Sequence, residues 1–406
     1  MSTFPRIILH NRKADAVKRF HPWIFSGAIK KVDPDLADGA IADIYSESGS
    51  YLATGHFSPG SIAVKILSFE PVEDIGQLFL AKFQAAYSLR HQVGLADSPT
   101  TNCYRLVNAE GDGLPGLIVD WYNGTAVLQA YSAGMYAQRQ QIVACLQAVY
   151  GDRLQAVYDK SAAVLHSSGE AADNQYLLGQ RTDGIVLEHG HRFRVDWEEG
   201  QKTGFFVDQR EHRALLGRYA AGKSVLNTFC YSGGFSVYAL AAGASQVHSV
   251  DSSAKAIAWT TENVELNVEL NGAPNGAVNP SGASTHSAFT ADVFNFLKQC
   301  DADYDVIVLD PPAFAKTLSA RHQAVMAYKR LNALAFDKIR PNGIVFSFSC
   351  SQVVTPDLFK GAVTAAAIES GRQIRVLAHL TQPADHPTSI YHPEGLYLKG
   401  LVLHVE

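Results

Sequence analysis

The sequence predicts an α/β protein whose C-terminal half folds around a parallel sheet with helices on both faces. From about residue 200 onward, short apolar runs alternate with longer stretches whose apolar residues recur at helical spacing. The first 75 residues differ, because their apolar runs are short and separated by turn residues, as in a small β-rich domain. We therefore predict three domains in the 406 residues, at 1–75, 76–198 and 199–406.

The N-terminal domain is predicted to be a small β-barrel. Its strands are expected at 7–9, 24–25, 40–45, 51–53 and 62–67. The turn sequences SGS at 48–50 and SPG at 58–60 separate the later strands. Short apolar or alternating runs with such punctuation are typical of barrels and sandwiches.

The middle domain is predicted to be a compact α+β unit. A helix is expected at 74–95, where the apolar residues recur at helical spacing. A strand at 104–108 and a Gly/Pro turn at 111–116 follow. The next two strands are close enough in sequence to pair as a hairpin, and a helix comes after them. These elements are expected at 117–120, 126–130 and 135–149.

The C-terminal domain is predicted to alternate strands and helices. Strands are expected at 224–227, 246–250, 304–309 and 343–348. Helices are expected near 234–242, 253–270 and 319–339. Residues 271–287, rich in Asn, Gly, Ala, Ser and Pro, are predicted to form a surface loop. Apolar strands that alternate with amphipathic helices indicate a parallel sheet covered on both faces.

The composition argues against several classes of protein. Hydrophobic residues make up 47% and charged residues 18%, as in ordinary globular proteins. We find no apolar run of about 20 residues, so we expect no transmembrane helix, and the N-terminus lacks the apolar stretch of a signal peptide. The five cysteines form no CxxC pair, which argues against a disulfide framework or a metal site such as zinc. We expect a reduced, cytoplasmic protein without a membrane partner.

The charge distribution is uneven along the chain. The net charge is −5, whereas a dedicated nucleic-acid binder is often basic overall. Residues 1–32 nevertheless hold seven lysines and arginines against a single acidic residue, Asp15. A local basic stripe of this kind can supply phosphate contacts while the rest of the protein stays acidic. A solvated surface with chance clustering would give the same pattern.

Residues after the first strand of the C-terminal sheet are candidates for binding a nucleoside cofactor, because ligands of open parallel sheets bind at the carboxyl ends of the strands. Gly233 and Gly234 allow a sharp turn and a close approach of the backbone. Asp251, at the end of the second strand, could hydrogen-bond ribose hydroxyls. The GxGxxG fingerprint of pyrophosphate binding is absent, which favours S-adenosylmethionine. A Gly-rich turn with a helix-capping Asp would give the same pattern.

Two further strand ends carry candidate site residues. Asp292 and Val293 follow the third strand region, where an acid and an apolar residue suit the adenine amino group and ring; an ordinary helix N-cap would use the same residue types. The fourth strand ends at Asp310, and Pro311 and Pro312 stiffen the loop that holds this carboxylate at the sheet edge. A rigid Asp-Pro-Pro turn can present a polar group to the amide or amidine edge of a nucleobase.

Cys350 is the candidate nucleophile. It follows the fifth strand, 40 residues after Asp310, so the two side chains could face one substrate from adjacent strand ends. Small polar residues flank it at the carboxyl end of a strand, where an exposed thiolate would lie. We interpret the remaining cysteines as small hydrophobes. These are Cys103, Cys145, Cys230 and Cys300.

Seven stretches carry a resemblance to known proteins. Three of them are similar to motifs of the Rossmann-fold RNA 5-methylcytosine methyltransferases: NTFCYSGGFS at 227–236, DPP at 310–312 and FSCS at 348–351. The others are RFHPWIFSGA at 19–28, VNAEGDGLPG at 107–116, KTGFFVDQR at 202–210 and PEGLYLKG at 393–400. Taken together, and in their order along the chain, these stretches resemble the large-subunit ribosomal RNA methyltransferase I family. The resemblance spans nearly the whole chain.

The resemblance implies a PUA domain, a central α+β domain and a Rossmann-like class I methyltransferase domain. It implies methylation of C5 of a cytosine in 23S ribosomal RNA or a large-subunit precursor, with S-adenosylmethionine as cofactor. The Cys350 thiolate would add to C6, and Asp310 would hold the N3/N4 edge. The residues expected to bind the cofactor are Phe229, Tyr231, Gly233, Asp251, Asp292, Val293, Asp310 and Pro311. Those expected on the RNA face are Arg19, Trp23, Ser26 and Lys30.

This chain departs from many RNA 5-methylcytosine enzymes at one position. They carry a second cysteine directly after Asp-Pro-Pro, where this chain has Ala313. The base that removes the C5 proton therefore has no assigned residue. Some residues of the flanking motifs could close over the site or form a structural network; these are Lys202, Asp208, Gln209 and Arg210. Others have polar ends that could reach it; these are Tyr397 and Lys399, which are predicted to lie on a C-terminal strand, and Glu394.

Two other classes of function stay open at this stage. An S-adenosylmethionine-dependent methyltransferase could act on another RNA, on a base nitrogen or on a substrate that is not a nucleic acid. Asp-Pro-Pro followed by an aromatic residue is typical of amino-methylating enzymes, and Phe314 lies one residue beyond that place. A non-catalytic RNA-binding protein is the third class. The sequence gives neither the target nucleotide nor the oligomeric state, a homodimer included.

Overall fold

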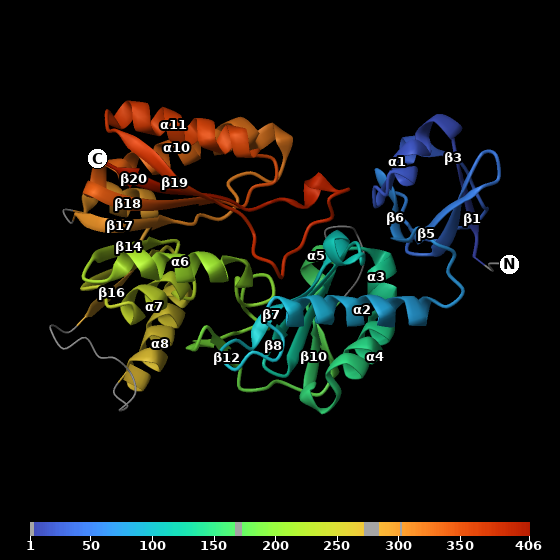
Figure 1. Cartoon of the computed structure of the whole chain (residues 1–406), viewed down its shortest axis with the longest axis horizontal. Helices are drawn as coiled ribbons and strands as arrows, with labels where there is room; N and C mark the ends of the chain where they lie inside the picture. The colour runs from blue at the N-terminus through green and yellow to red at the C-terminus, as the bar shows by residue number, and fades with distance from the viewer. Residues whose placement is uncertain (1–3, 167–172, 272–283, 301–302) are drawn as a thin grey trace. The chain divides into compact units, whose positions relative to one another are not determined.

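The computed structural model describes residues 4–166, 173–271, 284–300 and 303–406. They form two compact units (Figure 1). The first unit comprises Met1–Val186, Val195–Val207 and Ala384–Gly395. The second comprises Leu187–Arg194, Asp208–Pro383 and Leu396–Glu406. The segments 195–207 and 384–395 thus return to the first unit after the chain has entered the second.

The first unit begins with a sheet of order β2-β6-β5-β4-β1-β3. Its strands are β1 (Arg6–Leu9), β2 (Trp23–Phe25), β3 (Ile29–Val32), β4 (Ile41–Ser46), β5 (Tyr51–Phe57) and β6 (Ile62–Ser68). The five predicted strands are confirmed, whereas β3 and the short helix α1 (Asp15–Lys18) were not predicted. Strand β3 lacks the apolar or alternating pattern that predicts a strand, because its two middle residues, Lys30 and Lys31, are exposed. Ile7, Ile44 and Val64 are among the buried side chains of this core.

The rest of the first unit is an α+β layer built on a sheet of order β11-β10-β9-β8-β7. Its strands are β7 (Cys103–Asn108), β8 (Leu117–Tyr122), β9 (Thr125–Ala130), β10 (Ala156–Asp159) and β11 (Gln175–Leu178). Its helices are α2 (Ile75–Gln92), α3 (Ala133–Ala137), α4 (Arg139–Tyr150) and α5 (Ala162–His166). The predicted hairpin is confirmed, because β8 and β9 pair antiparallel. The predicted helix at 135–149 is in fact two helices that meet at Gln138.

The second unit holds a sheet of order β16-β15-β14-β17-β18-β20-β19. Its strands are β14 (Ser224–Thr228), β15 (Gln246–Asp251), β16 (Thr285–Thr290), β17 (Tyr304–Leu309), β18 (Ile339–Ser349), β19 (Ile374–Leu380) and β20 (Lys399–Val405). Strands β14 to β18 run parallel, and β20 runs antiparallel to both of its neighbours. The strand order reverses at β14, because its two neighbours are β15 and β17. In sheets of this kind, ligands bind at the carboxyl ends of the strands beside such a reversal, here β14 and its neighbours β15 and β17.

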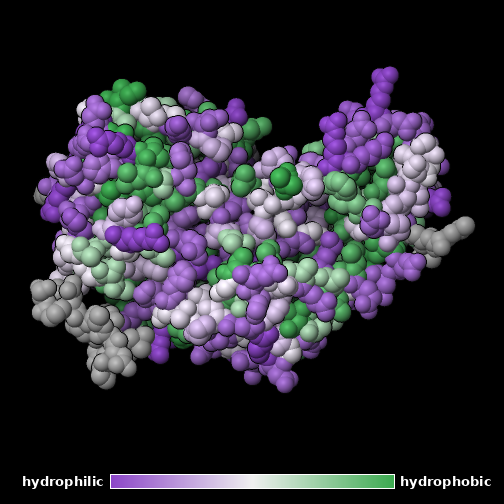
Figure 2. Space-filling view, in the orientation of Figure 1, coloured by the Kyte–Doolittle hydropathy of each residue, from purple (hydrophilic) through white to green (hydrophobic). Residues whose placement is uncertain are grey.

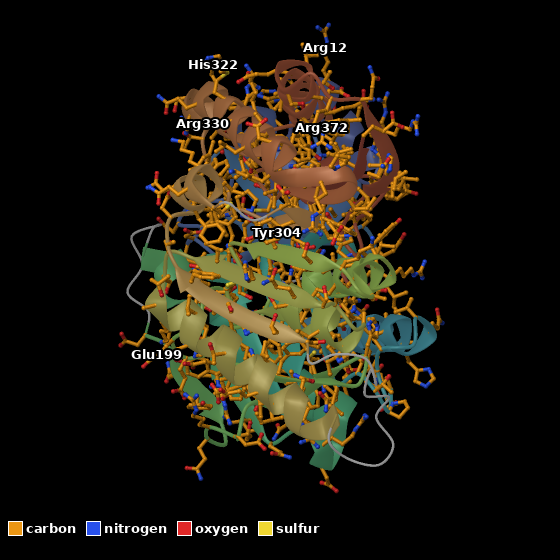
Figure 3. The ribbon with its side chains drawn as sticks, turned by 90° about the vertical axis from the view of Figure 1, so that its left-hand side faces the viewer. Arg12, Glu199, Tyr304, His322, Arg330 and Arg372 are labelled. Carbon is orange, nitrogen blue, oxygen red and sulfur yellow. The ribbon has the colours of Figure 1, made fainter. Side chains whose placement is uncertain are left out.

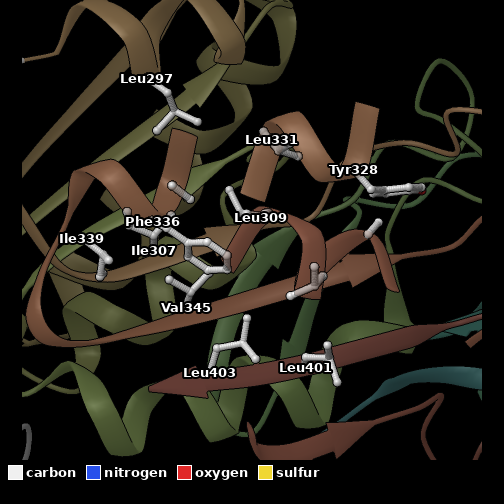
Figure 4. Packing of buried hydrophobic residues seen from close by; sticks show 14 of the residues in the cluster. Leu297, Ile307, Leu309, Tyr328, Leu331, Phe336, Ile339, Val345, Leu401 and Leu403 are labelled. Carbon is white, nitrogen blue, oxygen red and sulfur yellow. The ribbon is translucent and has the colours of Figure 1, made fainter. Parts of the chain in front are cut away.

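Helices pack on both faces of this sheet. They are α6 (Arg210–Ala220), α7 (Gly234–Ala241), α8 (Ala254–Asn271), α9 (Val293–Gln299), α10 (Arg321–Lys338) and α11 (Pro356–Ser370). Helices α10 and α11 cover one face, and α6 and α7 lie on the other (Figure 1). Figure 4 shows the α10 side, where Leu331 and Phe336 pack on Ile307 and Val345. The α/β fold predicted from the alternating pattern is confirmed.

An arginine ties the edge of this layer together. Arg372, labelled in Figure 3, follows α11 and donates from one terminal nitrogen to the carbonyls of Phe336 at 2.7 Å and Ile339 at 2.6 Å. Its Nε donates to the carbonyl of Glu406 at 2.9 Å. These carbonyls belong to the last turn of α10, the first residue of β18 and the residue after β20, so one side chain links three elements of the layer.

Two sequence-based expectations need correction. The predicted loop 271–287 is too long, because Asn271 ends α8 and Thr285 already pairs with Gln246 in the sheet; residues 272–283 lie outside the described residues. Tyr397 was predicted on the last strand but precedes it, since β20 begins at Lys399. Among all the described residues, no helix is both long enough and apolar enough to cross a bilayer.

Candidate active site

Residues 229–233 form the loop between β14 and α7, which we call the cofactor loop, and its backbone is unusual. Phe229 and Tyr231 have φ angles of 55° and 49°, and Gly233 has a φ of 76°. Such left-handed conformations cost a residue with a Cβ atom about 1–2 kcal/mol each. Strain of this kind persists only where the surrounding structure imposes it, and it clusters at ligand-binding sites. This loop is one that the sequence singled out for the cofactor.

Neighbouring elements impose the shape of this loop. The backbone N–H of Tyr231 donates to Asp251 at 3.1 Å, and its carbonyl accepts from the Thr260 hydroxyl at 3.0 Å. The amide of Asn263 donates to the carbonyl of Ser232 at 2.8 Å. A Cβ atom on Gly233 would lie 2.8 Å from Cγ2 of Thr260. Helix α8 therefore presses on the turn so closely that only glycine fits there.

The predicted ribose and adenine residues occupy the neighbouring strand ends. Asp251 ends β15, and its second carboxylate oxygen accepts from the N–H of Ser253 at 2.9 Å. Asp292 is exposed and caps α9, accepting from the N–H of Asn295 at 2.9 Å. Val293 is buried in the core. Each carboxylate oxygen has two acceptor positions, so both acids keep capacity for hydroxyl or amino donors.

Asp310 and Cys350 follow the adjacent parallel strands β17 and β18, and Leu309, the last residue of β17, pairs with Ser347 of β18. The sulfur of Cys350 lies 3.9 Å from the carbonyl oxygen of Pro311. The structure thus brings together the predicted nucleophile and the predicted Asp-Pro-Pro loop. Both side chains are part-buried, at the end of the sheet where ligands bind.

A hydrogen-bond chain fixes the orientation of Asp310. Oδ1 of Asp310 accepts from Nε2 of Gln209 at 3.0 Å. The side-chain amide oxygen Oε1 of Gln209 is 2.5 Å from Nδ1 of His212, which must donate because an amide oxygen can only accept. Burial lowers the pKa of His212 to about 4, so the ring is neutral. With Oδ1 engaged as an acceptor, Oδ2 is the oxygen of Asp310 that is left to carry a proton.

Burial raises the pKa of Asp310 to about 7, and the negative charge of Asp208 adds to the effect. The nearby cation of Arg213 and the hydrogen bond from Gln209 act in the opposite direction. A carboxyl group with such a pKa can hold a proton near neutral pH and donate it to a base nitrogen. The site therefore supplies a candidate acid as well as a candidate nucleophile.

Cys350 lies in an environment that opposes its ionisation. Burial raises the pKa of the thiol to about 11, and the charges of Asp310 and Asp208 raise it further. The cation of Lys399 works against them. Nζ of Lys399 donates to the carbonyl of Ser351 at 2.6 Å, which holds it one residue from the thiol. Burial also lowers the pKa of Lys399 to about 8.

Beneath the cofactor loop lies a buried ion cluster. Arg213 donates twice to Glu188, from Nε at 2.8 Å and from Nη2 at 2.7 Å. Arg210 approaches the same carboxylate at 3.8 Å, and all three side chains are buried. A Cβ on Gly234 would lie 2.7 Å from Cδ of Arg213, so the cluster supports the start of α7. The structure gives Arg210 the network role that the sequence left open.

Sequence reasoning missed His212, Arg213 and Glu188. Gln209, His212 and Arg213 are buried and follow one another at the spacing of one helical face. Polar residues at such spacing ahead of an apolar strand are a signal that could have found this network. Lys202, by contrast, is exposed and belongs to the first unit.

The candidate RNA residues of the first unit differ in exposure. Arg19 and Ser26 are exposed. Lys30 is exposed but pairs with Glu47. Trp23 is half-buried, and its indole N–H donates to Glu110 at 2.8 Å. The His21 ring lies 6.2 Å from that of Trp23, and its Nε2 is 3.8 Å from a carboxylate oxygen of Glu394.

The remaining cysteines behave as small hydrophobes. Cys103, Cys145 and Cys230 are buried, and the part-buried Cys300 points its sulfur toward the carbonyl of Leu297 at 3.7 Å. Among the described residues, no cluster of His, Cys, Asp and Glu side chains has the geometry of a metal site.

The fold and the site define a class of protein. A sheet in which β20 lies antiparallel among parallel strands, with a strained cofactor loop after its first strand, is that of an S-adenosylmethionine-dependent methyltransferase. The model of the S-adenosylmethionine-dependent methyltransferase family matches residues 106–395, and a PUA-like domain model matches residues 7–69. The donor groups of the loop and the acid at Asp251 fit a nucleoside of this kind. The protein uses S-adenosylmethionine.

Relatives narrow the class to one family. The chain is 37% identical to ribosomal RNA large subunit methyltransferase I of Klebsiella pneumoniae (strain 342), over 100% of this chain and 99% of the relative. The enzyme of Escherichia coli (strain SMS-3-5 / SECEC) is also 37% identical, over 98% and 99% of the two chains. The chain belongs to the ribosomal RNA large subunit methyltransferase I family.

Solved structures agree with this assignment. A protein from Streptococcus mutans, assigned as an S-adenosylmethionine-dependent methyltransferase, superposes with a TM-score of 0.81 at 25% identity, covering 98% of this chain and 100% of that one. A structure assigned as a methyltransferase and complexed with S-adenosylhomocysteine gives a TM-score of 0.82, with the same identity and coverage.

Proposed function

We propose that the protein methylates C5 of a cytosine in 23S ribosomal RNA through a covalent adduct of Cys350. The observation that carries the proposal is the pairing of a thiol with a protonatable carboxyl group at adjacent strand ends. Cytosine C5 is a weak nucleophile and needs activation by addition at C6. Cys350 can supply that addition, and Asp310 can supply the proton that the ring then requires.

The residues divide the reaction between them. The Cys350 thiolate adds to C6, and the electron pair of the C5=C6 bond moves toward N3, where protonated Asp310 donates from Oδ2. Gln209 holds Asp310 in this orientation through its bond to Oδ1. Bound S-adenosylmethionine supplies an electrophilic methyl group, which C5 attacks. Lys399 favours the thiolate because its cation lowers the pKa of Cys350.

One observation weighs against methylation of a base nitrogen. Enzymes of that kind use an aromatic residue after Asp-Pro-Pro, and here Phe314 is the nearest. Its ring packs on Tyr328 at 4.8 Å and faces Phe294 at 6.3 Å, so it belongs to the α10 side of the core. A nitrogen nucleophile also has no need of Cys350. Methylation of another RNA or of a base nitrogen is the alternative.

An exposed aromatic and basic surface of the first unit suits RNA. Phe20, Phe25 and Tyr391 are 48%, 50% and 52% exposed, and the rings of Phe20 and Tyr391 lie 5.3 Å apart. The exposed residue Arg19 directly precedes Phe20 in the chain, and the exposed residue Arg12 lies on the short 3-10 helix before α1. Figure 2 shows hydrophilic residues gathered over α1. Exposed rings can stack on unpaired bases while cations neutralise phosphates.

The test uses cells that lack the protein. Their ribosomal RNA is mapped for 5-methylcytidine at single-nucleotide resolution, with rescue by wild type, by Cys350→Ala and by the matched control Cys300→Ala. We expect one large-subunit site to disappear and to return with wild type and Cys300→Ala only. An unchanged map, or rescue by Cys350→Ala, would contradict the proposal. Binding of S-adenosylhomocysteine by purified Cys350→Ala checks that the variant is folded.

A further inference from the structure

Asp208 holds a carboxylate oxygen that the functions assigned so far leave unused. Its Oδ2 accepts from the phenol of Tyr397 at 2.6 Å. Its Oδ1 is buried and has no hydrogen-bond partner among the described residues. An unpaired buried acceptor destabilises the folded state, and more so when it is charged. A native site that keeps such an atom calls for an explanation from function.

Contacts on either side of Asp208 place it within the reaction site. The next residue, Gln209, donates to Asp310, so the Asp208 backbone adjoins the acid. On the other side, Tyr397 lies two residues before Lys399, whose ammonium binds the carbonyl of Ser351 next to the nucleophile. The charge of Asp208 raises the pKa of both Asp310 and Cys350, which places it within electrostatic range of each.

We propose that Oδ1 of Asp208 is the base that removes the C5 proton after methyl transfer. The inference rests on the proposed function. The C5–H bond breaks and its proton passes to Oδ1. In the same step the electron pair of the C5–H bond forms the C5=C6 double bond, and the C6–Sγ bond breaks with its electron pair returning to the sulfur of Cys350. N3 gives back to Asp310 the proton that it accepted, so the products are 5-methylcytosine, the Cys350 thiolate and protonated Asp208, which returns its proton to solvent.

The neighbouring groups are less suited to this step. Asp310 is engaged with the N3 edge and with Gln209. Lys399 carries a cation at neutral pH and has its ammonium on Ser351. The ring of His212 is held through Nδ1 against the side-chain oxygen of Gln209. Asp208 itself opposes formation of the Cys350 thiolate, so its charge hinders the first step and serves the last one.

The experiment replaces Asp208 by asparagine, which can still accept from Tyr397. Purified enzyme is mixed with 23S ribosomal RNA from cells that lack the protein and with S-adenosylmethionine labelled in its methyl group. We expect a burst of one labelled methyl group per enzyme, retained in an enzyme–RNA adduct that survives denaturing gel electrophoresis. Steady-state turnover should fall by roughly 10²–10⁴-fold, the usual contribution of a general base. Asp357→Asn, an exposed position on α11, is the matched control and should turn over as wild type.

Several outcomes would overturn the inference. Turnover of Asp208→Asn at the wild-type rate would exclude it, and so would a variant that binds S-adenosylhomocysteine but shows neither burst nor adduct. If Asp208→Asn does not fold, Tyr397→Phe provides the test, because it removes the hydrogen bond that positions Asp208 and keeps the carboxylate itself. We expect the adduct to live longer in Tyr397→Phe, and an unchanged lifetime would contradict the role of Asp208.

A parallel reaction separates this inference from the proposed function. Wild-type enzyme is given 23S ribosomal RNA transcribed with 5-fluorocytidine. This nucleotide carries fluorine in place of hydrogen at C5, so a base has no C5 proton to remove. A methylated adduct must then accumulate if Cys350 adds to C6. Failure to form it would contradict the proposed function. Its formation, together with absence of the adduct from Asp208→Asn on unmodified RNA, would overturn the Asp208 assignment alone.

Discussion

At the scale of single residues, the site holds charges where they are unfavourable. Asp310 is a carboxyl group that burial and a second carboxylate drive toward the protonated form. Cys350 is a thiol that the same two acids keep protonated. Perturbed groups of this kind are typical of active sites. Burial leaves Asp310 close to the protonated state that donation to N3 requires, whereas Cys350 must still lose its proton before it can react.

Asp310→Asn should stabilise the protein at alkaline pH. The pKa of Asp310 is about 7 in the folded protein and ~3.9 in an unfolded chain. The folded state therefore binds a proton more tightly, and stability falls as pH rises from ~4 to ~7. Asparagine keeps the acceptor for Gln209 and never ionises. Denaturant unfolding should show a gain for Asp310→Asn of up to about 4 kcal/mol above pH ~8, since one pKa unit is worth ~1.4 kcal/mol.

The gain from Asp310→Asn should shrink toward zero near pH ~4, where both side chains are neutral. Asp357→Asn serves as the control, since Asp357 is exposed and its removal relieves no burial. A gain for Asp310→Asn that is the same at every pH would show that the substitution acts through packing rather than through the charge.

Lys399→Gln should slow the reaction of Cys350 with an alkylating reagent. The Lys399 cation lowers the pKa of Cys350, so its removal leaves less thiolate at any given pH. Lys338→Gln is the matched control, because Nζ of Lys338 binds the carbonyl of Cys300 at 2.6 Å just as Lys399 binds that of Ser351. Mass spectrometry would follow each cysteine at about pH 8. We expect a several-fold slower rate at Cys350 in Lys399→Gln only; equal rates in both variants would refute the electrostatic role.

At the scale of elements, the cofactor loop is shaped by α8 more than by its own sequence. Gly233→Ala should meet two penalties: a positive φ of 76° and a contact of 2.8 Å with Thr260. We expect loss of about 1–2 kcal/mol in stability from the φ angle alone. Affinity for S-adenosylmethionine should fall by tenfold or more, measured by calorimetry, because the turn must move.

Gly222→Ala separates strain from displacement. Gly222 has a φ of 69°, yet an added Cβ would meet no atom within 4 Å. It should lose similar stability while binding S-adenosylmethionine like wild type. Equal losses of affinity in the two variants would mean that the contact with Thr260 does not shape the loop.

The elements that sequence analysis predicted are those with a strong local signal. Strands β14 and β17 are buried along almost their whole length because helices cover both faces, and their apolar runs allowed the sequence to predict their positions. Strand β3 could not, since Ile29 and Val32 flank two exposed lysines. The hydrogen bond between Gln209 and Asp310 spans 101 residues, and no local pattern encodes it. Motifs locate reactive groups, whereas the network that tunes them depends on tertiary packing.

At the scale of the whole molecule, charge is divided unevenly between the N-terminal segment and the rest. The chain carries a net charge of −5, although residues 1–32 hold a large excess of basic side chains. An acidic body should repel RNA in general, so that binding depends on the local basic surface. This arrangement would favour a structured target over indiscriminate contact.

The double variant Arg12→Gln, Arg19→Gln should therefore weaken RNA binding and make it less dependent on salt. Each phosphate contact contributes about −0.7 to −0.9 to the slope of log K against log salt concentration. Loss of two contacts should reduce the slope by about 1.4–1.8, as measured by filter binding to 23S ribosomal RNA from cells that lack the protein. The control neutralises two exposed lysines of the second unit, Lys298→Gln and Lys360→Gln, with the same change in net charge. If both variants change the slope equally, the net charge and not the N-terminal surface governs binding; if neither does, the RNA surface lies elsewhere.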